Sequence, residues 1–248
     1  RASIKIQEGC DQVCSYCIIP TVRGRERSVD PTNLISQINE LSINGIKEVV
    51  LTGTQLGNYG FDLNGINLSK LLVKILNETD VPRIRVSSLQ PKEIDNEIID
   101  IWTNEGLGRI CPHFHVPLQS GSDKILKEMR RRYTSSEYLD VISNIKKLIP
   151  ECSITSDVIV GFPEESDSDF LETISTIEKA KLSDVHVFPY SKRPGTTAFY
   201  NKNQIHSSVI KDRTKELLNL VHRLSGIAKQ SLIGKERSIL WEGQSKTF

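Results

Sequence analysis

The sequence predicts an α/β fold, built as a partial, open parallel β/α barrel of about six βα units that resembles part of a TIM barrel. Three observations support this. First, six short apolar segments typical of strands alternate with helical segments, and such alternation produces right-handed crossovers and a parallel sheet with helices outside. Second, a closed barrel has eight units in about 250 residues, whereas only six are found in these 248 residues. Third, a polar or glycine-rich segment follows each predicted strand, where parallel α/β proteins bind ligands.

The first half of the chain contains three of these units. Residues 2–7 alternate between apolar and polar side chains and predict a strand. Asp30 followed by Pro31 predicts a helix start, because Asp caps free amides and Pro fits the first turn. Gly45 is expected to end that helix. Further strands are expected at 48–53 and 83–88, and further helices at 68–78 and from Pro91 to about Gly106.

The second half of the chain contains the other three units. Thr134 and Glu137 form a capping box that starts a helix, whose buried face is expected to include Ile145 and Leu148. Ser166 is expected to start an acidic helix. Strands are expected at 113–119, 153–162 and 184–190, and a long final helix at 205–233.

Composition narrows the class of protein. The chain has 32 basic and 31 acidic residues, so its overall charge does not favour a nucleic-acid partner, and any such binding must use local patches. No apolar stretch reaches the ~18 residues of a membrane helix, so we expect no membrane association. The five cysteines are an odd number and three are crowded, which suits metal or cluster binding in a reducing compartment. We therefore expect a cytoplasmic protein, and a monomer.

Three cysteines, Cys10, Cys14 and Cys17, lie in the segment that follows the first predicted strand. Three thiolates can hold an iron–sulfur cluster and leave one iron open to an outside ligand. The alternative is a tetrahedral zinc site with Cys111 or His113 as the fourth ligand. A third possibility is that the cysteines are reduced and structural. The residues alone leave these alternatives open.

The spacing Cys-x3-Cys-x2-Cys after the first strand of a partial barrel resembles the radical S-adenosylmethionine (SAM) enzymes. The resemblance implies that Cys10, Cys14 and Cys17 hold a [4Fe–4S] cluster and are catalytic. It also implies that the amino and carboxylate groups of SAM chelate the fourth iron. An electron, supplied by a reducing donor, would then split SAM into methionine and a 5′-deoxyadenosyl radical.

The other loops match this superfamily in order. "LTGTQLGNYG" resembles the loop that meets the SAM amino group, "LQSGS" the segment that contacts ribose, and "DVIVGFPEE" the strand and loop beside adenine. The usual "GFPGE" reads "GFPEE" here, so either Glu164 or Glu165 is expected to fill the acidic role. The resemblance implies these cofactor-binding residues: Tyr16, Gly53, Thr54, Gln55, Gln119, Ser120, Gly161 and Glu164.

A closer resemblance is to the methylthiotransferases, which replace a C–H bond with C–S–CH3. "CIIP", "SSLQP" and "HVFPYSKRPGT" resemble the branch that acts on C2 of N6-threonylcarbamoyladenosine in tRNA. Sister branches act on isopentenyladenosine in tRNA and on an aspartate of a ribosomal protein. Two basic runs, which include Arg23 and Arg131, would then contact tRNA phosphates or substrate, and Arg193 on the sixth loop would lie near the substrate entry. Arg131 also matches the Met-x-Arg-x-Tyr pattern of the family, so a cofactor-side or structural role is an alternative for it. The competing class is a non-catalytic, metal-stabilised RNA-binding module.

The resemblance also predicts the domain organisation. Residues 1–203 would be the radical SAM core, 204–233 its C-terminal helix and linker, and 234–248 the truncated start of an RNA-binding β-barrel of the TRAM type. An N-terminal domain with a second [4Fe–4S] cluster is expected only in the full-length protein. We therefore expect this chain to bind and split SAM without completing methylthiolation.

Overall fold

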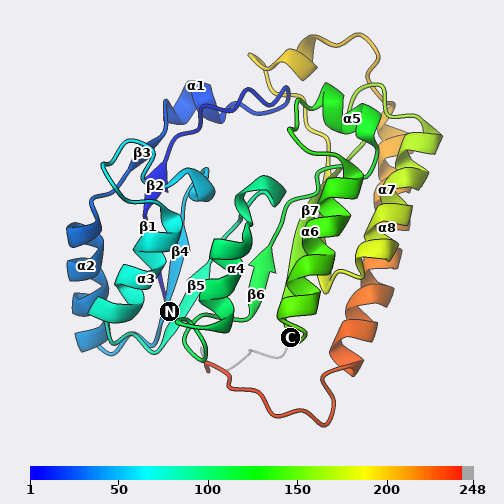
Figure 1. Cartoon of the computed structure of the whole chain (residues 1–248). Helices are drawn as coiled ribbons and strands as arrows, with labels where there is room; N and C mark the ends of the chain where they lie inside the picture. The colour runs from blue at the N-terminus through cyan, green and yellow to red at the C-terminus, as the bar shows by residue number, and fades with distance from the viewer. Residues whose placement is uncertain (242–248) are drawn as a thin grey trace.

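Six parallel strands form the centre of the molecule, in a computed structural model that describes residues 1–241 (Figure 1). They pair in sequential order as two sheets, β1-β4-β5 and β6-β7-β8. Isolated bridges from Ile84 to Ile110 and from Ser88 to His115 connect β5 to the β6 region. The strands are β1 (Ala2–Lys5), β4 (Glu48–Thr52), β5 (Arg83–Val86), β6 (His113–His115), β7 (Ser153–Val160) and β8 (Asp184–Pro189).

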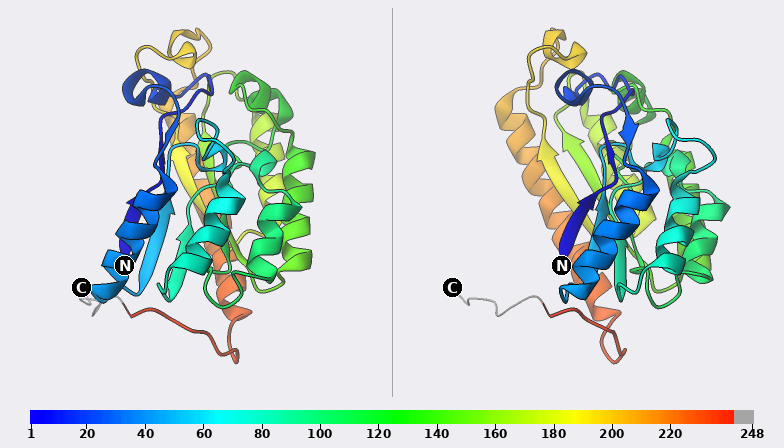
Figure 2. Two further views of the ribbon diagram at one scale, coloured as in Figure 1. Left: turned by 60° about the vertical axis from the view of Figure 1, so that its left-hand side comes forward. Right: turned by 90° about the vertical axis from the view of Figure 1, so that its left-hand side faces the viewer.

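Helices cover the outside of these strands, as the turned views show (Figure 2). No pairing joins β1 to β8 within residues 1–241, so the barrel is open there. The predicted partial parallel β/α barrel is therefore confirmed. The covering helices are α2 (Pro31–Ile43), α3 (Leu68–Glu78), α4 (Asn96–Thr103), α6 (Ser135–Leu148), α7 (Asp167–Ala180) and α8 (Ser207–Gln230).

Short elements gather at the end of the barrel to which the strands point (Figure 1). The helices α1 and α5 lie there, together with the segment that follows β8. Neither of these two helices was predicted, because they are too short for a clear helical period. The short elements are α1 (Ile19–Arg23), α5 (Asp123–Glu128), the 3-10 turns η1 (Leu56–Asn58), η2 (Pro91–Glu93) and η3 (Thr197–Tyr200), and the antiparallel pair β2 (Gln7–Glu8) and β3 (Arg27–Ser28).

Capping side chains set the predicted helix starts. The Asp30 carboxylate accepts hydrogen bonds from the amides of Thr32 and Asn33 at the start of α2. Thr134 and Glu137 form the predicted capping box of α6. These bonds satisfy amides that have no partner inside the helix, so the local sequence determines where these helices begin.

Three details differ from the predictions. The helix expected from Pro91 is divided, because Asp95 accepts from the amide of Ile98 and starts α4 separately. Strand β6 stops at His115 instead of 119, near Pro117, which lacks an amide proton to pair with β7. Leu148 was predicted to be buried but is 42% exposed.

The C-terminal segment is described only in part. Residues 234–241 contain no strand, and the remainder of the predicted 234–248 barrel start lies outside the described residues. Within residues 1–241, no helix has both the length and the apolar character needed to cross a membrane.

Candidate functional site

A glycine shapes the start of the cysteine loop. Gly9 has a φ of +79°, and a Cβ atom there would lie 1.9 Å from the carbonyl oxygen of Arg25. The next residue, Cys10, donates its amide proton to the carbonyl of Gly24 at 3.2 Å. Only glycine fits so close to the neighbouring backbone. Gly9 therefore places the first cysteine, a role that sequence reasoning missed although Gly9 directly precedes Cys10.

Ser15 anchors the middle of the loop between two other rim segments. Its amide donates to Met129 O at 3.2 Å, and its hydroxyl donates to Glu128 O at 2.6 Å. Its carbonyl accepts from the amide of Ala198 at 2.7 Å. Side chains between and beside these contacts, including the cysteines, are thereby held over the end of the barrel.

The three cysteines line one cavity of about 220 Å³. Most of the other lining side chains come from the rim loops after β4, β5 and β6, as expected for ligand sites of parallel α/β folds. Five other predicted site residues line it as well: Tyr16, Thr54, Gln55, Gln119 and Arg131. Residues that were not predicted include Gln12, Ser88, Gln90 and Glu93.

The cysteine side chains are half-buried thiols that need a nearby positive charge to ionise. Burial raises the pKa of Cys10 to about 11 and also raises the pKa of Cys17. Bound metal makes coordinating thiols lose their protons. A metal centre would thus supply the charge that makes these buried thiols into ligands.

The three sulfur atoms are more widely spaced than the ligands of a single zinc ion. Within residues 1–241, the cysteine Sγ atoms form no group whose members all lie within 4.8 Å of one another. Zinc with Zn–S bonds of about 2.3 Å would bring its sulfur ligands to roughly 3.8 Å. The two proposed fourth zinc ligands, Cys111 and His113, do not line the cavity. A four-iron cluster separates its thiolates more widely because each binds a different iron.

Arg131 extends into this cavity and touches a cysteine. Its Nη1 lies 3.4 Å from Sγ of Cys14, and its Nε donates to the hydroxyl of Tyr133 at 3.2 Å. Burial disfavours its charge, but the neighbouring Tyr133, Tyr16 and Cys14 hold the pKa of Arg131 above its usual value. The cavity therefore contains a permanent positive charge beside the cysteines.

A polar chain continues from the β4 loop to Glu93. Gln7, which is fully buried, accepts from the amides of Thr54 and Gln55 at 2.9 and 2.8 Å. The side-chain amide of Gln55 donates to the carboxylate of Glu93. The backbone amide of Gln90 donates to the same carboxylate at 2.8 Å. Burial raises the pKa of Glu93 to about 7. Nothing in the sequence pattern singled out Gln7 or Glu93.

Several predicted site residues do not reach the cavity with their side chains. Ser120 is fully buried and faces Thr173 of α7, with their hydroxyl oxygens 3.3 Å apart. Arg23 is exposed and pairs with Glu8 at 3.3 Å. Gly53 packs its backbone against Gln7 and Leu56. These three positions contact other parts of the fold and not the first cavity.

The "GFPEE" segment packs against α8 and the chain that precedes it. A Cβ on Gly161 would lie 2.3 Å from Ile210 of α8. Glu164 has a φ of +69° and accepts from the side-chain amide of Asn201 at 3.0 Å. Glu165 is buried, accepts from the amide of Gly161 and pairs with Arg213 at 2.6 Å. Neither glutamate lines the cysteine cavity.

A second cavity, of about 490 Å³, adjoins the first. Tyr16, Cys17 and Gln119 line both. Tyr190 and the predicted Arg193 line the second cavity alone. A ligand there would lie directly beside the cysteines.

Comparisons with known proteins show the family of this chain. A family profile described as "Radical SAM superfamily" matches residues 4–177. The threonylcarbamoyladenosine tRNA methylthiotransferase MtaB of Bacillus subtilis (strain 168) is 42% identical over 98% of this chain and 52% of its own length. A tRNA-2-methylthio-N(6)-dimethylallyladenosine synthase of Caldicellulosiruptor saccharolyticus is 41% identical over 99% of this chain and 52% of its own length. The chain thus spans about half the length of these relatives.

Solved structures share the fold at low sequence identity. The radical SAM methyltransferase TsrM from Kitasatospora setae has a TM-score of 0.64 at 16% identity, over 80% of this chain and 38% of its own. Coproporphyrinogen III oxidase HemN from Escherichia coli has a TM-score of 0.63 at 14% identity, over 90% of this chain and 52% of its own. The family profile covers most of the barrel and the whole cysteine loop. The chain belongs to the radical SAM superfamily.

Proposed function

We propose that this chain is the catalytic part of a tRNA methylthiotransferase that acts at C2 of N6-threonylcarbamoyladenosine. The observation that carries the proposal is the three-cysteine cavity and its direct contact with a second cavity. The names of two relatives at 42% and 41% identity support it, since both refer to a modified adenosine in tRNA. The full reaction would convert a C–H bond into C–S–CH3.

The residues of the first cavity would serve the cofactors. Cys10, Cys14 and Cys17 would hold a [4Fe–4S] cluster, and together with SAM this group supplies a 5′-deoxyadenosyl radical when reduced. Gln55 and Gln119 would orient SAM through their side-chain amides. Thr54 and Tyr16 complete the proposed SAM contacts, while Gly53, Ser120, Gly161 and Glu164 would act by supporting the surrounding loops.

The second cavity would receive the nucleoside. Tyr16 and Tyr190 give it aromatic walls, which suit a base turned out of its stack. Arg193 adds a guanidinium that suits a carboxylate. This cation favours a substituent that ends in a carboxylate, such as threonylcarbamoyl, over the apolar isopentenyl group. The exposed Arg23, Arg130 and Arg132 would contact tRNA phosphates, whereas Arg131 faces the first cavity.

Hydrogen transfer from the substrate tests the proposal without any sulfur donor. An anticodon stem-loop RNA with deuterium at C2 of N6-threonylcarbamoyladenosine is incubated anaerobically with the reconstituted chain, SAM and dithionite. We expect deuterium in the 5′-deoxyadenosine that forms, and none when the label is at C8. Unlabelled product from both RNAs would contradict the proposed position of attack. Labelling from an isopentenyladenosine RNA alone would instead assign the sister reaction.

Three further points belong to the same proposal. The sulfur atom would come from a second cluster in a domain outside this chain, and the electron from a reducing partner protein. Residues 1–203 would form the catalytic core, with 204–233 as the linking helix and 234–248 as the start of an RNA-binding barrel. A tRNA substrate and free thiols fit a monomer that works in the reducing cytoplasm.

A further inference from the structure

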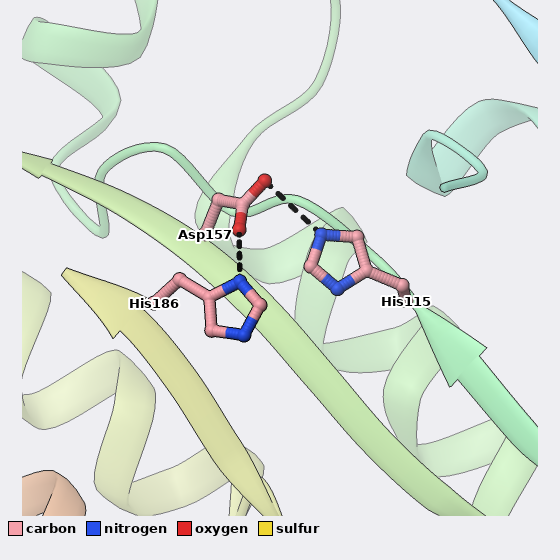
Figure 3. Close-up of side chains that lie close together, drawn as sticks. All are labelled: His115, Asp157 and His186. Carbon is pink, nitrogen blue, oxygen red and sulfur yellow. Dashed lines mark ion pairs between the residues drawn. The ribbon is translucent and has the colours of Figure 1, made fainter. Parts of the chain in front are cut away.

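A second group of metal-ligating side chains lies on neighbouring strands of the barrel, apart from the cysteines. His115, Asp157 and His186 project from β6, β7 and β8 toward one another (Figure 3). The strand register brings them together, since Asp157 lies opposite His186 and the neighbouring Thr155 lies opposite His115. One ligand atom from each of the three lies within 4.8 Å of the other two.

The contacts inside this group are close, but one carboxylate oxygen has only an ion-pair contact and accepts no aligned hydrogen bond. His115 Nε2 lies 3.0 Å from Asp157 Oδ2, and His186 Nδ1 lies 3.2 Å from Oδ1. Even so, Oδ1 is buried and accepts no hydrogen bond from any described residue. A buried carboxylate oxygen without a donor costs free energy unless something else neutralises it. A cation between the carboxylate and the imidazoles would do so.

The other nitrogen of His115 has the partner that a metal-binding histidine needs. Its Nδ1 lies 2.9 Å from the hydroxyl oxygen of Thr155, and Nε2 of His113 lies 3.0 Å from the same oxygen. The hydroxyl has one proton, so it donates to one imidazole and accepts from the other. If it donates to His113, His115 carries its proton on Nδ1, and its Nε2 lone pair faces Asp157. Such a second contact commonly orients metal-binding histidines.

We infer that His115, Asp157 and His186 bind a divalent transition-metal ion such as Zn²⁺ or Fe²⁺. Two imidazoles and one carboxylate are a ligand set that both ions accept. Adjacent ligands about 2.0–2.2 Å from such an ion lie roughly 2.9–3.6 Å apart, a range that includes the contacts of 3.0 and 3.2 Å from the two imidazoles to the two oxygens of Asp157. Three protein ligands leave a coordination position open. Asp157 also lines the second cavity, so an oxygen ligand from water or a bound molecule can fill that position.

Zinc binding tests the inference once the cysteines are removed. In a background with Cys10, Cys14 and Cys17 all replaced by serine, isothermal titration with Zn²⁺ is expected to show one site per chain. Adding His115→Ala or Asp157→Asn is expected to weaken that binding at least tenfold. His222→Ala is the matched control, because His222 is an exposed histidine on α8 outside the group. It should leave the affinity unchanged.

Cobalt gives a second readout that does not depend on affinity. Co²⁺ in the same background is expected to show the visible absorption of a four- or five-coordinate site, without thiolate charge-transfer bands, and to lose it in the Asp157→Asn variant. Circular dichroism spectra and melting curves establish that each variant is folded. A folded triple-serine chain that binds no Zn²⁺, or one whose binding survives Asp157→Asn, would overturn the inference. Asp157 would then simply pair with protonated histidines.

Discussion

Replacing Arg131 with methionine should lower the reduction potential of the cluster that we propose the three cysteines hold. Arg131 lies 3.4 Å from Sγ of Cys14, and it forms no salt bridge with a carboxylate among residues 1–241, although its charge lowers the pKa of nearby Glu93 against the effect of burial. Tyr133 fixes it from the other side, since the guanidinium lies 5.1 Å from the ring centre. A positive charge beside the thiolates stabilises the reduced, more negative state of a cluster. Methionine keeps much of the volume and removes that charge.

The size of the effect follows from Coulomb's law. At an effective dielectric constant of about 20, two unit charges separated by the 3.4 Å of this contact interact by about 5 kcal/mol. This value is an upper limit, because the added electron spreads over the whole cluster and lies farther away on average. We expect about 1–3 kcal/mol, which is roughly 40–130 mV for a one-electron couple.

The assay is an anaerobic redox titration followed by electron paramagnetic resonance, with the cluster reconstituted and SAM omitted. Arg131→Lys should lower the reduction potential less than Arg131→Met does, because lysine keeps the positive charge but lacks the planar guanidinium. The control is Arg132→Met, because Arg132 is the exposed neighbour and its charge is screened by solvent. A fully loaded Arg131→Met protein with the wild-type potential would refute the reasoning. Weaker SAM binding without a potential change would instead make Arg131 a SAM ligand.

Three other substitutions test the structure of the rim. Gly9→Ala should abolish cluster incorporation and destabilise the fold by several kcal/mol, because its Cβ would lie 1.9 Å from Arg25 O; normal iron content would contradict this. Glu164→Gly should be about 1 kcal/mol more stable than Glu164→Ala in denaturant unfolding, since the φ of +69° suits glycine; equal stabilities would show that this backbone is unstrained. Burial raises the pKa of Glu93 to about 7, so the folded state holds the Glu93 proton more tightly than the unfolded state does. The folded state therefore loses stability as pH rises from about 4.5 through 7. Glu93→Gln should therefore gain stability relative to wild type between pH 5 and pH 8, by up to about 2–3 kcal/mol. If the free energies of unfolding of the two proteins change in parallel with pH, the raised pKa is refuted.

The sequence predicted the elements whose causes are local. The strand spacing, the Asp30 cap and the Thr134 capping box depend on residues within a few positions of one another. The cysteine motif was likewise visible because its ligands are close in sequence. Polar residues after the predicted strands also indicated which loops form the ligand site, and Gln55 and Gln119 of these loops line the cavity.

Long-range contacts explain what the sequence did not reveal. Ser120 and Gly161 lie in the predicted loops, but their contacts are with α7 and α8, which no local pattern indicates. Gln7 and Glu93 are separated by 86 positions and meet through the 53–55 loop. The grouping of His115, Asp157 and His186 depends on the register of three strands, and sequence alone does not specify that register.

Formation of 5′-deoxyadenosine tests the central claim most directly. The chain is reconstituted anaerobically with iron and sulfide, mixed with SAM and dithionite, and the product is quantified by mass spectrometry. We expect 5′-deoxyadenosine from wild type and from the Cys152→Ala variant, since Cys152 lies outside the cavity, and none from Cys14→Ala. Product that persists without Cys14, or its absence from a cluster-loaded wild-type chain, would contradict the account.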